Sequence, residues 1–226
     1  MLVEIPSLLN TEQAAALHER LKAASWVDGR VTAGYQAAAV KNNAQLAEDD
    51  PTARELADSV LRALERSALF MSAALPLRVY PPMFNRYAEG QAFGTHVDTA
   101  IRSIPATPVR VRTDLSATLF LTPPDEYAGG ELVIEDSYGA HAVKLPAGHL
   151  ILYPAGSLHD VRPVTRGVRY GCFFWVQSMV RLDSDRTLLF DLDTAIQSLA
   201  RGDAGKAVTV QLTGIYHNLL RRWAET

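Results

Sequence analysis

The feature that most constrains the fold is the segment 77–180, where short apolar stretches follow one another without a helical pattern between them. Clusters of Pro, Gly, Asp and Ser separate these stretches, as expected for strands joined by turns. The predicted strands are Arg78–Tyr80, Met83–Tyr87, Leu115–Leu121, Glu131–Glu135, Ala142–Leu145, Leu150–Tyr153, Asp160–Val164 and Val168–Val176. Many short strands in succession predict an antiparallel double sheet, the double-stranded β-helix or jelly roll.

The amino-terminal segment 1–76 is predicted to be a helical support region for this core. Asn10 or Thr11 can cap a helix that runs to about Ala24. Asp50-Pro51 is a favourable N-cap and N1 pair and opens a second helix, which ends before Pro76. Between these helices, the weakly alternating stretch 26–40 can hold a strand.

The carboxy-terminal segment 181–226 is predicted to be a helical hairpin. Asp183 can cap a helix that stops near Gly202, and a last helix carries apolar residues from Val208 to Trp223. The apolar stripes predict either packing on the barrel or a symmetric contact that forms a homo-oligomer. The fold class is therefore mainly β with flanking α, in the order 1–76, 77–180 and 181–226.

Charge and hydropathy exclude several classes of protein. The net charge of the 226 residues is −3 and no basic run of five occurs, so a nucleic-acid-binding surface is not indicated. No stretch of 18 apolar residues occurs, and the first residues lack the pattern of a signal peptide. Cys172 is the only cysteine and is predicted to be a buried thiol. These features predict a cytoplasmic protein without a membrane partner.

His96, Asp98 and His159 form the constellation with the clearest chemistry. On a strand, positions 96 and 98 project to the same side and can bind one ion together. Two imidazoles and one carboxylate form a facial triad that leaves three positions open on octahedral Fe(II), enough for O₂ and a bidentate co-substrate. Zinc also accepts two histidines and a carboxylate, so a zinc site stays open at this point.

The residues around these ligands resemble a known family. Aromatic and glycine residues precede them in Tyr87-Ala-Glu-Gly-Gln-Ala-Phe-Gly-Thr-His96, and turns follow in Tyr127-Ala-Gly-Gly130 and Tyr153-Pro-Ala-Gly156. The chain is similar to Fe(II)/2-oxoglutarate dioxygenases of the prolyl-4-hydroxylase type, and most similar to bacterial PKHD-type hydroxylases. The likeness also covers Trp26-Val-Asp-Gly29, Lys41-Asn-Asn43 and Asn85-Arg-Tyr87.

The resemblance implies Fe(II) as metal, 2-oxoglutarate as co-substrate and L-ascorbate as reductant. It makes Arg169 the anchor of the 2-oxoglutarate C5 carboxylate and Tyr87 a hydrogen-bond donor to the same molecule. Arg169 begins an apolar strand, where an inward-facing guanidinium must be paired. A ligand carboxylate suits its planar fork, although a structural salt bridge with a protein acid stays open, as does a core role for Tyr87.

The polar stretch 99–113 is long enough to be a loop beside the metal, where it can act as a substrate lid. Asn85, Arg102 and Trp175 are candidate substrate-contacting residues, or residues that support the metal ligands, on position alone. Asp98 argues against a halogenase, because related halogenases lack this carboxylate so that chloride can bind the iron.

The leading hypothesis from the resemblance is a hydroxylase that couples oxidation of 2-oxoglutarate to succinate and CO₂ with insertion of oxygen into a C–H bond. The resemblance leaves the substrate open between a peptidyl residue and a siderophore-related small molecule. Two alternatives belong to other classes: a metal- and 2-oxoglutarate-binding sensor without turnover, and a zinc hydrolase on a jelly-roll scaffold.

Overall fold

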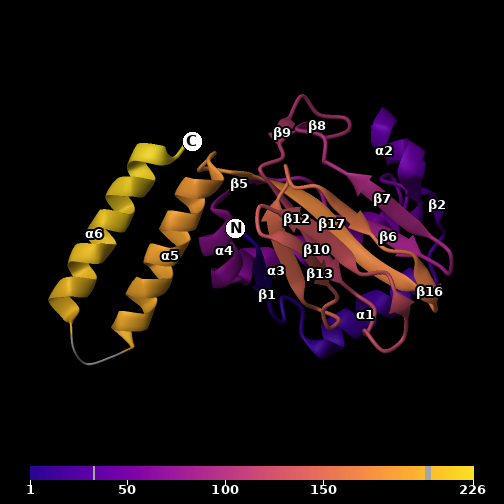
Figure 1. Cartoon of the computed structure of the whole chain (residues 1–226), viewed down its shortest axis with the longest axis horizontal. Helices are drawn as coiled ribbons and strands as arrows, with labels where there is room; N and C mark the ends of the chain where they lie inside the picture. Colours follow the sequence, from indigo (N-terminus) through magenta and orange to yellow (C-terminus); the bar gives the residue numbers. More distant parts are fainter. Residues whose placement is uncertain (33, 202–204) are drawn as a thin grey trace.

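The computed structural model describes residues 1–32, 34–201 and 205–226. Its centre is a pair of antiparallel sheets (Figure 1). In sheet order, the larger sheet contains β1 (Val3–Ile5), β14 (Leu150–Pro154), β10 (Leu115–Phe120), β17 (Arg169–Ser178), β6 (Met83–Tyr87), β4 (Ala44–Gln45) and β2 (Val27–Asp28), and β5 (Pro76–Val79) also pairs with β17. The smaller sheet contains β13 (Gly139–Val143), β12 (Leu132–Asp136), β15 (His159–Val161), β7 (Ala92–His96) and β3 (Lys41–Asn42).

Two further sheets contain two short strands each. One pairs β8 (Ile101–Ser103) with β9 (Arg110–Arg112), and the other pairs β11 (Ala128–Gly129) with β16 (Val164–Arg166). The helices are α1 (Thr11–Lys22), the 3₁₀ turn η1 (Gly29–Thr32), α2 (Tyr35–Val40), α3 (Pro51–Arg66), α4 (Ala68–Ala74), α5 (Asp183–Ala200) and α6 (Lys206–Trp223). The predicted jelly roll with amino-terminal helices and a carboxy-terminal helix pair is confirmed.

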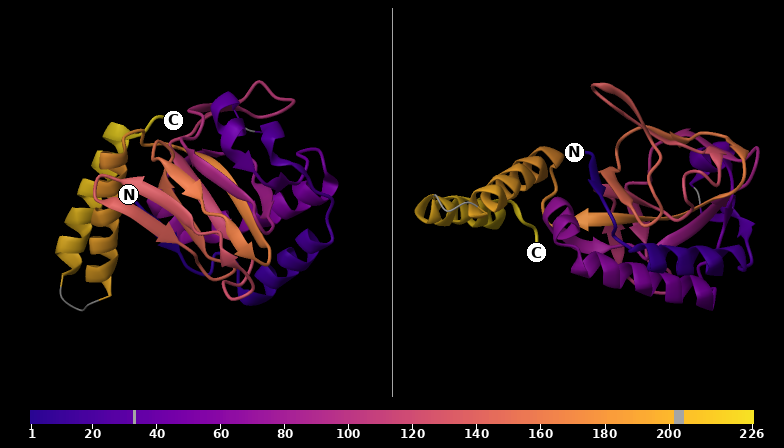
Figure 2. Two further views of the ribbon diagram at one scale, coloured as in Figure 1. Left: turned by 45° about the vertical axis from the view of Figure 1, so that its right-hand side comes forward. Right: turned by 90° about the horizontal axis from the view of Figure 1, so that it is seen from below.

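The larger sheet separates two cores, and β10 shows how its sequence serves both. Leu115 and Leu119 pack with the apolar faces of α1 and α3 on one side of the sheet. Phe120 packs in the second core with residues of the smaller sheet, such as Leu132 and Ile134. Figure 2 shows the helices as a layer against the larger sheet. This period-2 alternation leaves the polar residues Ser116 and Thr118 facing the space between the sheets.

The amino-terminal region agrees with its prediction in one place and differs in another. The stretch 26–40 holds a strand as predicted, the two-residue β2, and η1 and α2 occupy most of the rest. The helix predicted from Pro51 to before Pro76 is two helices, because the Ser67 hydroxyl accepts a hydrogen bond from the Phe70 amide and caps a new helix. The predicted capping by Asn10 and by Asp50-Pro51 is confirmed.

The strand pattern also differs from its prediction near the proposed ligands. A strand was expected here only around positions 96 and 98, and residues 92–95 of β7 were not predicted. A glycine is required at position 94, because a Cβ there would lie 2.9 Å from the Cβ of Val40 on α2. The single strand predicted over 160–164 is split into β15 and β16. The stretch 99–113 is a hairpin of β8 and β9 rather than an open loop.

Helices α5 and α6 form a pair that extends from one end of the molecule beside α4 (Figures 1 and 2). Their small core joins Leu75, Val180 and Leu189 with Tyr216 and Trp223. Asp183 does not cap α5 as predicted, because Leu182 is the N-cap residue and the Asp183 carboxylate instead binds the Met1 amino group. Gly202, where the helix was predicted to stop, lies outside the described residues. None of the described helices is both long and apolar enough to cross a membrane.

Candidate metal and co-substrate site

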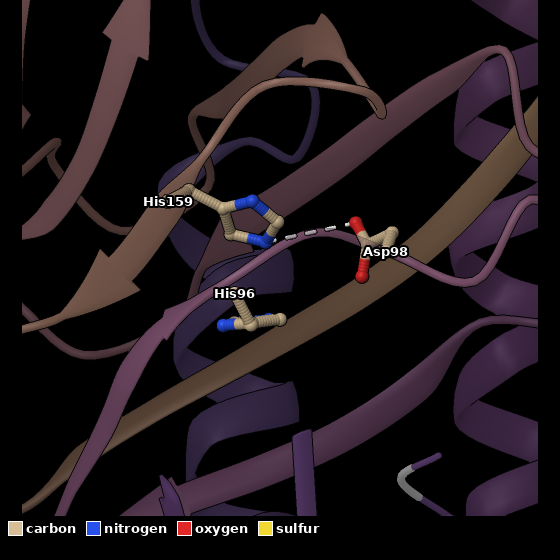
Figure 3. A group of neighbouring side chains, drawn as sticks. All are labelled: His96, Asp98 and His159. Atoms are coloured by element: carbon tan, nitrogen blue, oxygen red, sulfur yellow. Dashed lines mark ion pairs between the residues drawn. The ribbon is translucent and has the colours of Figure 1, made fainter. Parts of the chain in front are cut away.

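His96 and His159 meet because β7 and β15 are paired with these two residues directly opposite each other. Their imidazole centroids are 4.2 Å apart. Asp98 follows the end of β7, so the expectation that positions 96 and 98 share a strand face was wrong in detail. Ligand atoms of His96, Asp98 and His159 nevertheless lie within 4.8 Å of one another. Figure 3 shows the three side chains close together. The three side chains therefore provide one set of donor atoms for a single metal ion.

Contacts around these three side chains fix their orientation. The His96 Nδ1 lies 2.8 Å from the Gly94 carbonyl oxygen, and the His159 Nδ1 lies 3.0 Å from the Ser157 carbonyl oxygen. A carbonyl only accepts, so each Nδ1 carries the proton and each Nε2 is left for a metal. The Ser116 hydroxyl donates to the Asp98 carboxylate over 2.5 Å and holds it in place beyond the strand.

Electrostatics also favour a neutral His96. The pKa of His96 is lowered to about 4, mainly by burial and next by the neighbouring His159, while the hydrogen bond to Gly94 opposes the shift. The imidazole is therefore neutral at pH 7, the form that binds metal. The stacked ring of Phe93, with its centroid 3.6 Å away, covers the other side of this histidine.

Arg169 lies in the same pocket as the three ligands and is buried, with 1% of its surface exposed. It begins β17 as predicted, opposite Tyr87 of β6, and its guanidinium lies 5.2 Å from the ring centroids of Tyr87 and Phe120. Nε and Nη1 have no hydrogen-bond partner among the described residues. The structural salt bridge left open above is not seen there, and a bound carboxylate would satisfy these donors.

The other predicted residues are also brought to this pocket. Tyr87, Asn85, Arg102 and Trp175 line it. The Oδ1 of Asn85 is buried without a partner, and a Cβ at Gly171 would lie 3.0 Å from it. Gly171 therefore keeps space beside both Asn85 and Arg169.

Several lining residues were not singled out from the sequence. Ser116 and Thr118 are polar residues at alternate positions of an otherwise apolar strand, a signal that was available. Lys41 and Asn43 were noted only as part of the family resemblance. Lys41 is 7% exposed, and its pKa is lowered to about 8 by burial and by Arg102. Both side-chain polar atoms of Asn43 are buried without a hydrogen-bond partner.

Comparison with known proteins places the chain in a family. The model of the 2OG-Fe(II) oxygenase superfamily matches residues 82–177, and that of the PKHD-type hydroxylase C-terminal domain matches residues 183–225. A PKHD-type hydroxylase from Bordetella pertussis is 59% identical over 225 residues, covering 100% of both chains. One from Burkholderia ambifaria is 61% identical over 228 residues with the same coverage. The chain belongs to the PKHD-type hydroxylases.

Solved structures support the fold. A prolyl-4-hydroxylase from Pseudomonas putida matches with a TM-score of 0.52 and 20% identity, over 78% of this chain and 92% of its own. A prolyl hydroxylase from Trichoplax adhaerens, in complex with a hypoxia inducible factor peptide fragment, matches with a TM-score of 0.53 and 13% identity, over 83% and 86%. This PKHD-type hydroxylase is an Fe(II)- and 2-oxoglutarate-dependent enzyme, which confirms the predicted enzyme class.

Proposed function

We propose that His96, Asp98 and His159 hold Fe(II), and that the enzyme hydroxylates a peptidyl residue or a siderophore-related small molecule while releasing succinate and CO₂. The observation that carries the proposal is the set of three ligand atoms within 4.8 Å, in one pocket with a buried arginine. Bound iron and 2-oxoglutarate supply the oxidising chemistry, and the protein orients them and keeps water out.

Arg169 is the proposed partner of the 2-oxoglutarate C5 carboxylate. Its buried nitrogens Nε and Nη1 have no partner among the described residues and leave donors for a ligand carboxylate. Tyr87, opposite Arg169 in the sheet, is the proposed hydroxyl donor to the same molecule. Burial raises the pKa of Tyr87, so its hydroxyl keeps the proton that this role requires. A zinc hydrolase would leave the pairing of Arg169 with a co-substrate unexplained. A 2-oxoglutarate-binding sensor would keep this pairing, and it is distinguished from the enzyme by the absence of succinate release.

Ascorbate is the proposed reductant that keeps the iron in the Fe(II) state between turnovers. Its role is tested by succinate release from 2-oxoglutarate with and without ascorbate, because a reductant that serves only the iron raises the number of turnovers and leaves the initial rate unchanged. Asn85 and Trp175 are proposed to contact the substrate from β6 and β17, where both line the pocket.

A second copy of the chain is the proposed partner of the carboxy-terminal helices. Leu188 of α5 and Val208, Val210 and Ile215 of α6 expose between 43% and 72% of their surface. Paired helices with exposed apolar residues suit a symmetric helix-to-helix contact. None of the proposed site residues lies on these helices.

Alanine variants of His96, Asp98 and His159 test the metal assignment. Each variant is expected to lose Fe(II)-dependent succinate release while its thermal unfolding stays cooperative, because a three-ligand site that loses one ligand loses both affinity and geometry. His141→Ala is the matched control, since this half-buried histidine pairs with Asp136 and does not line the pocket. Near-normal turnover in any one of the three variants would show that the triad is wrongly assigned.

A further inference from the structure

Two cationic side chains line the pocket and have no role in binding the metal or 2-oxoglutarate as proposed above. Lys41 on β3 is almost completely buried, and Arg102 on β8 is half-buried. Both lie in the pocket that holds the metal ligands and Arg169. They come from separate elements that are brought together only by the fold.

Their contacts place the two charges next to each other. Thr32 accepts a hydrogen bond from each cation. Its hydroxyl lies 3.1 Å from the Lys41 Nζ, and its carbonyl oxygen lies 3.5 Å from an Arg102 nitrogen. Aromatic rings of β17 lie beneath the cations. The Arg102 guanidinium is 4.1 Å from the Trp175 ring centroid, and the Lys41 Nζ is 5.8 Å from that of Phe173.

No acidic side chain of the described residues forms an ion pair with either cation. The single carboxylate that lines the pocket belongs to Asp98, and it is occupied by the Ser116 hydroxyl and by its place in the metal donor set. The Nε of Arg102 is also buried without a hydrogen-bond partner. A buried cation without a counter-charge is costly, and Lys41 lies beside a second cation that also has no ion pair, so the two together indicate a missing anion.

The charge of the loaded site leaves the same deficit. Fe(II) and Arg169 together contribute three positive charges, and Asp98 and dianionic 2-oxoglutarate contribute three negative ones. These four groups cancel one another, and the charges of Lys41 and Arg102 remain uncompensated. 2-Oxoglutarate therefore does not serve as their counter-ion.

We propose that Lys41 and Arg102 bind an oxyanion of the primary substrate, a carboxylate or a phosphate, and thereby restrict the enzyme to anionic substrates. The proposal rests on the proposed function, because the charge count includes iron and 2-oxoglutarate. The rings of Phe173 and Trp175, 5.5 Å apart, would contact the apolar part of the same molecule. Among peptides this selects an acidic side chain or a free carboxy terminus close to the oxidised carbon.

Binding of small probes tests the proposal without knowledge of the natural substrate. The full-length protein is loaded with Zn(II), which accepts the same ligands without turnover, and saturated with 2-oxoglutarate. Benzoate, phenylphosphonate and neutral benzamide are then titrated by calorimetry. At least one of the two anions is expected to bind about tenfold more tightly than benzamide, as expected for one charge-assisted hydrogen bond. The tighter anion shows whether the site prefers a carboxylate or a phosphate.

Variants separate recognition of charge from support of the fold. Lys41→Met and Arg102→Gln are each expected to weaken anion binding about tenfold, whereas Lys41→Arg retains it. Arg110→Gln is the matched control, because Arg110 is an exposed cation on the partner strand β9 of the same hairpin. Thermal unfolding of each variant confirms that it is folded.

Three results would overturn the proposal: equal binding of anions and benzamide, no binding of either anion, or anion binding that survives both substitutions. Failure of the proposed function is seen separately. It would appear as loss of saturable 2-oxoglutarate binding to the Zn(II)-loaded protein in the first titration, before any probe is added.

Discussion

Replacing the buried Lys41 by methionine is expected to stabilise the protein. The pKa of Lys41 falls from 10.5 to about 8, mainly through burial and next through Arg102, while Asp98 and Asp28 oppose the change. A difference of one in pKa corresponds to about 1.4 kcal/mol, so the charged lysine lowers the free energy of unfolding by roughly 3 kcal/mol at pH 7. Methionine fills a similar volume without the charge.

Some favourable contacts are lost with the charge. The hydrogen bond to Thr32 and the attraction to the Phe93 and Phe173 rings together contribute about 1 to 2 kcal/mol. The net gain is therefore about 1 to 2 kcal/mol. For a chain of this length, that raises the midpoint of thermal unfolding by roughly 2 to 8 °C.

The pH dependence of this difference identifies its cause. The folded state releases the Lys41 proton near pH 8, whereas the unfolded chain keeps it up to about pH 10.5, so the unfolded state binds more protons in this window. The contribution of Lys41 to the free energy of unfolding of the wild type therefore becomes less unfavourable as the pH rises from about 8 to 10.5. The difference in stability between Lys41→Met and the wild type shrinks over the same range.

Calorimetric unfolding of metal-free protein between pH 7 and 10 measures both effects. Lys22→Met is the control, because Lys22 is exposed and forms only a surface ion pair with Glu19. Its substitution is expected to change stability by less than about 0.5 kcal/mol. A lower midpoint for Lys41→Met than for the wild type at pH 7, or an advantage that does not change with pH, would refute the reasoning.

Two further predictions concern the co-substrate and the carboxy-terminal helices. Arg169→Lys keeps the charge but loses the bidentate fork, so the KM for 2-oxoglutarate should rise about tenfold to a hundredfold, corresponding to roughly 1.5 to 3 kcal/mol. An unchanged KM in Arg169→Ala, together with a raised KM in Arg162→Ala, would show that Arg169 is wrongly assigned and that Arg162 binds 2-oxoglutarate. Truncation after Arg181 should expose the apolar residues around Leu75 and change the assembly state in light scattering. An unchanged assembly state and stability, with altered substrate preference, would instead assign these helices to the active site.

The central strands of the larger sheet and the long helices were predictable, because the spacing of their apolar residues matches the faces that the fold buries. Met83–Tyr87 has the predicted bounds, and β10 and β17 differ from theirs by one or two residues. Residues 92–95 of β7 were missed, because Gly94 and Thr95 weaken the apolar pattern there. Gly94 is explained by its contact with Val40, a residue more than 50 positions away that no local pattern includes.

The site was predictable in its donor types and not in its supporting contacts. His96, Asp98 and His159 stand out through their spacing and their neighbours in sequence. The hydrogen bond from Ser116 to Asp98 and the meeting of Lys41 with Arg102 at Thr32 depend on tertiary structure. Such contacts join strands and hairpins whose mutual placement the sequence pattern leaves open.

Strand register determines which of these residues can act together. His96 faces His159 across β7 and β15, and Arg169 faces Tyr87 across β17 and β6. A shift of one residue in either pair would turn one of the two side chains to the opposite face of its sheet. The metal donors and the arginine lie on different sheets, so the distance between them depends on how the two sheets pack. Phe120 lies in that packing and also contacts Arg169. The inter-sheet core therefore sets the position of the proposed co-substrate anchor relative to the metal donors.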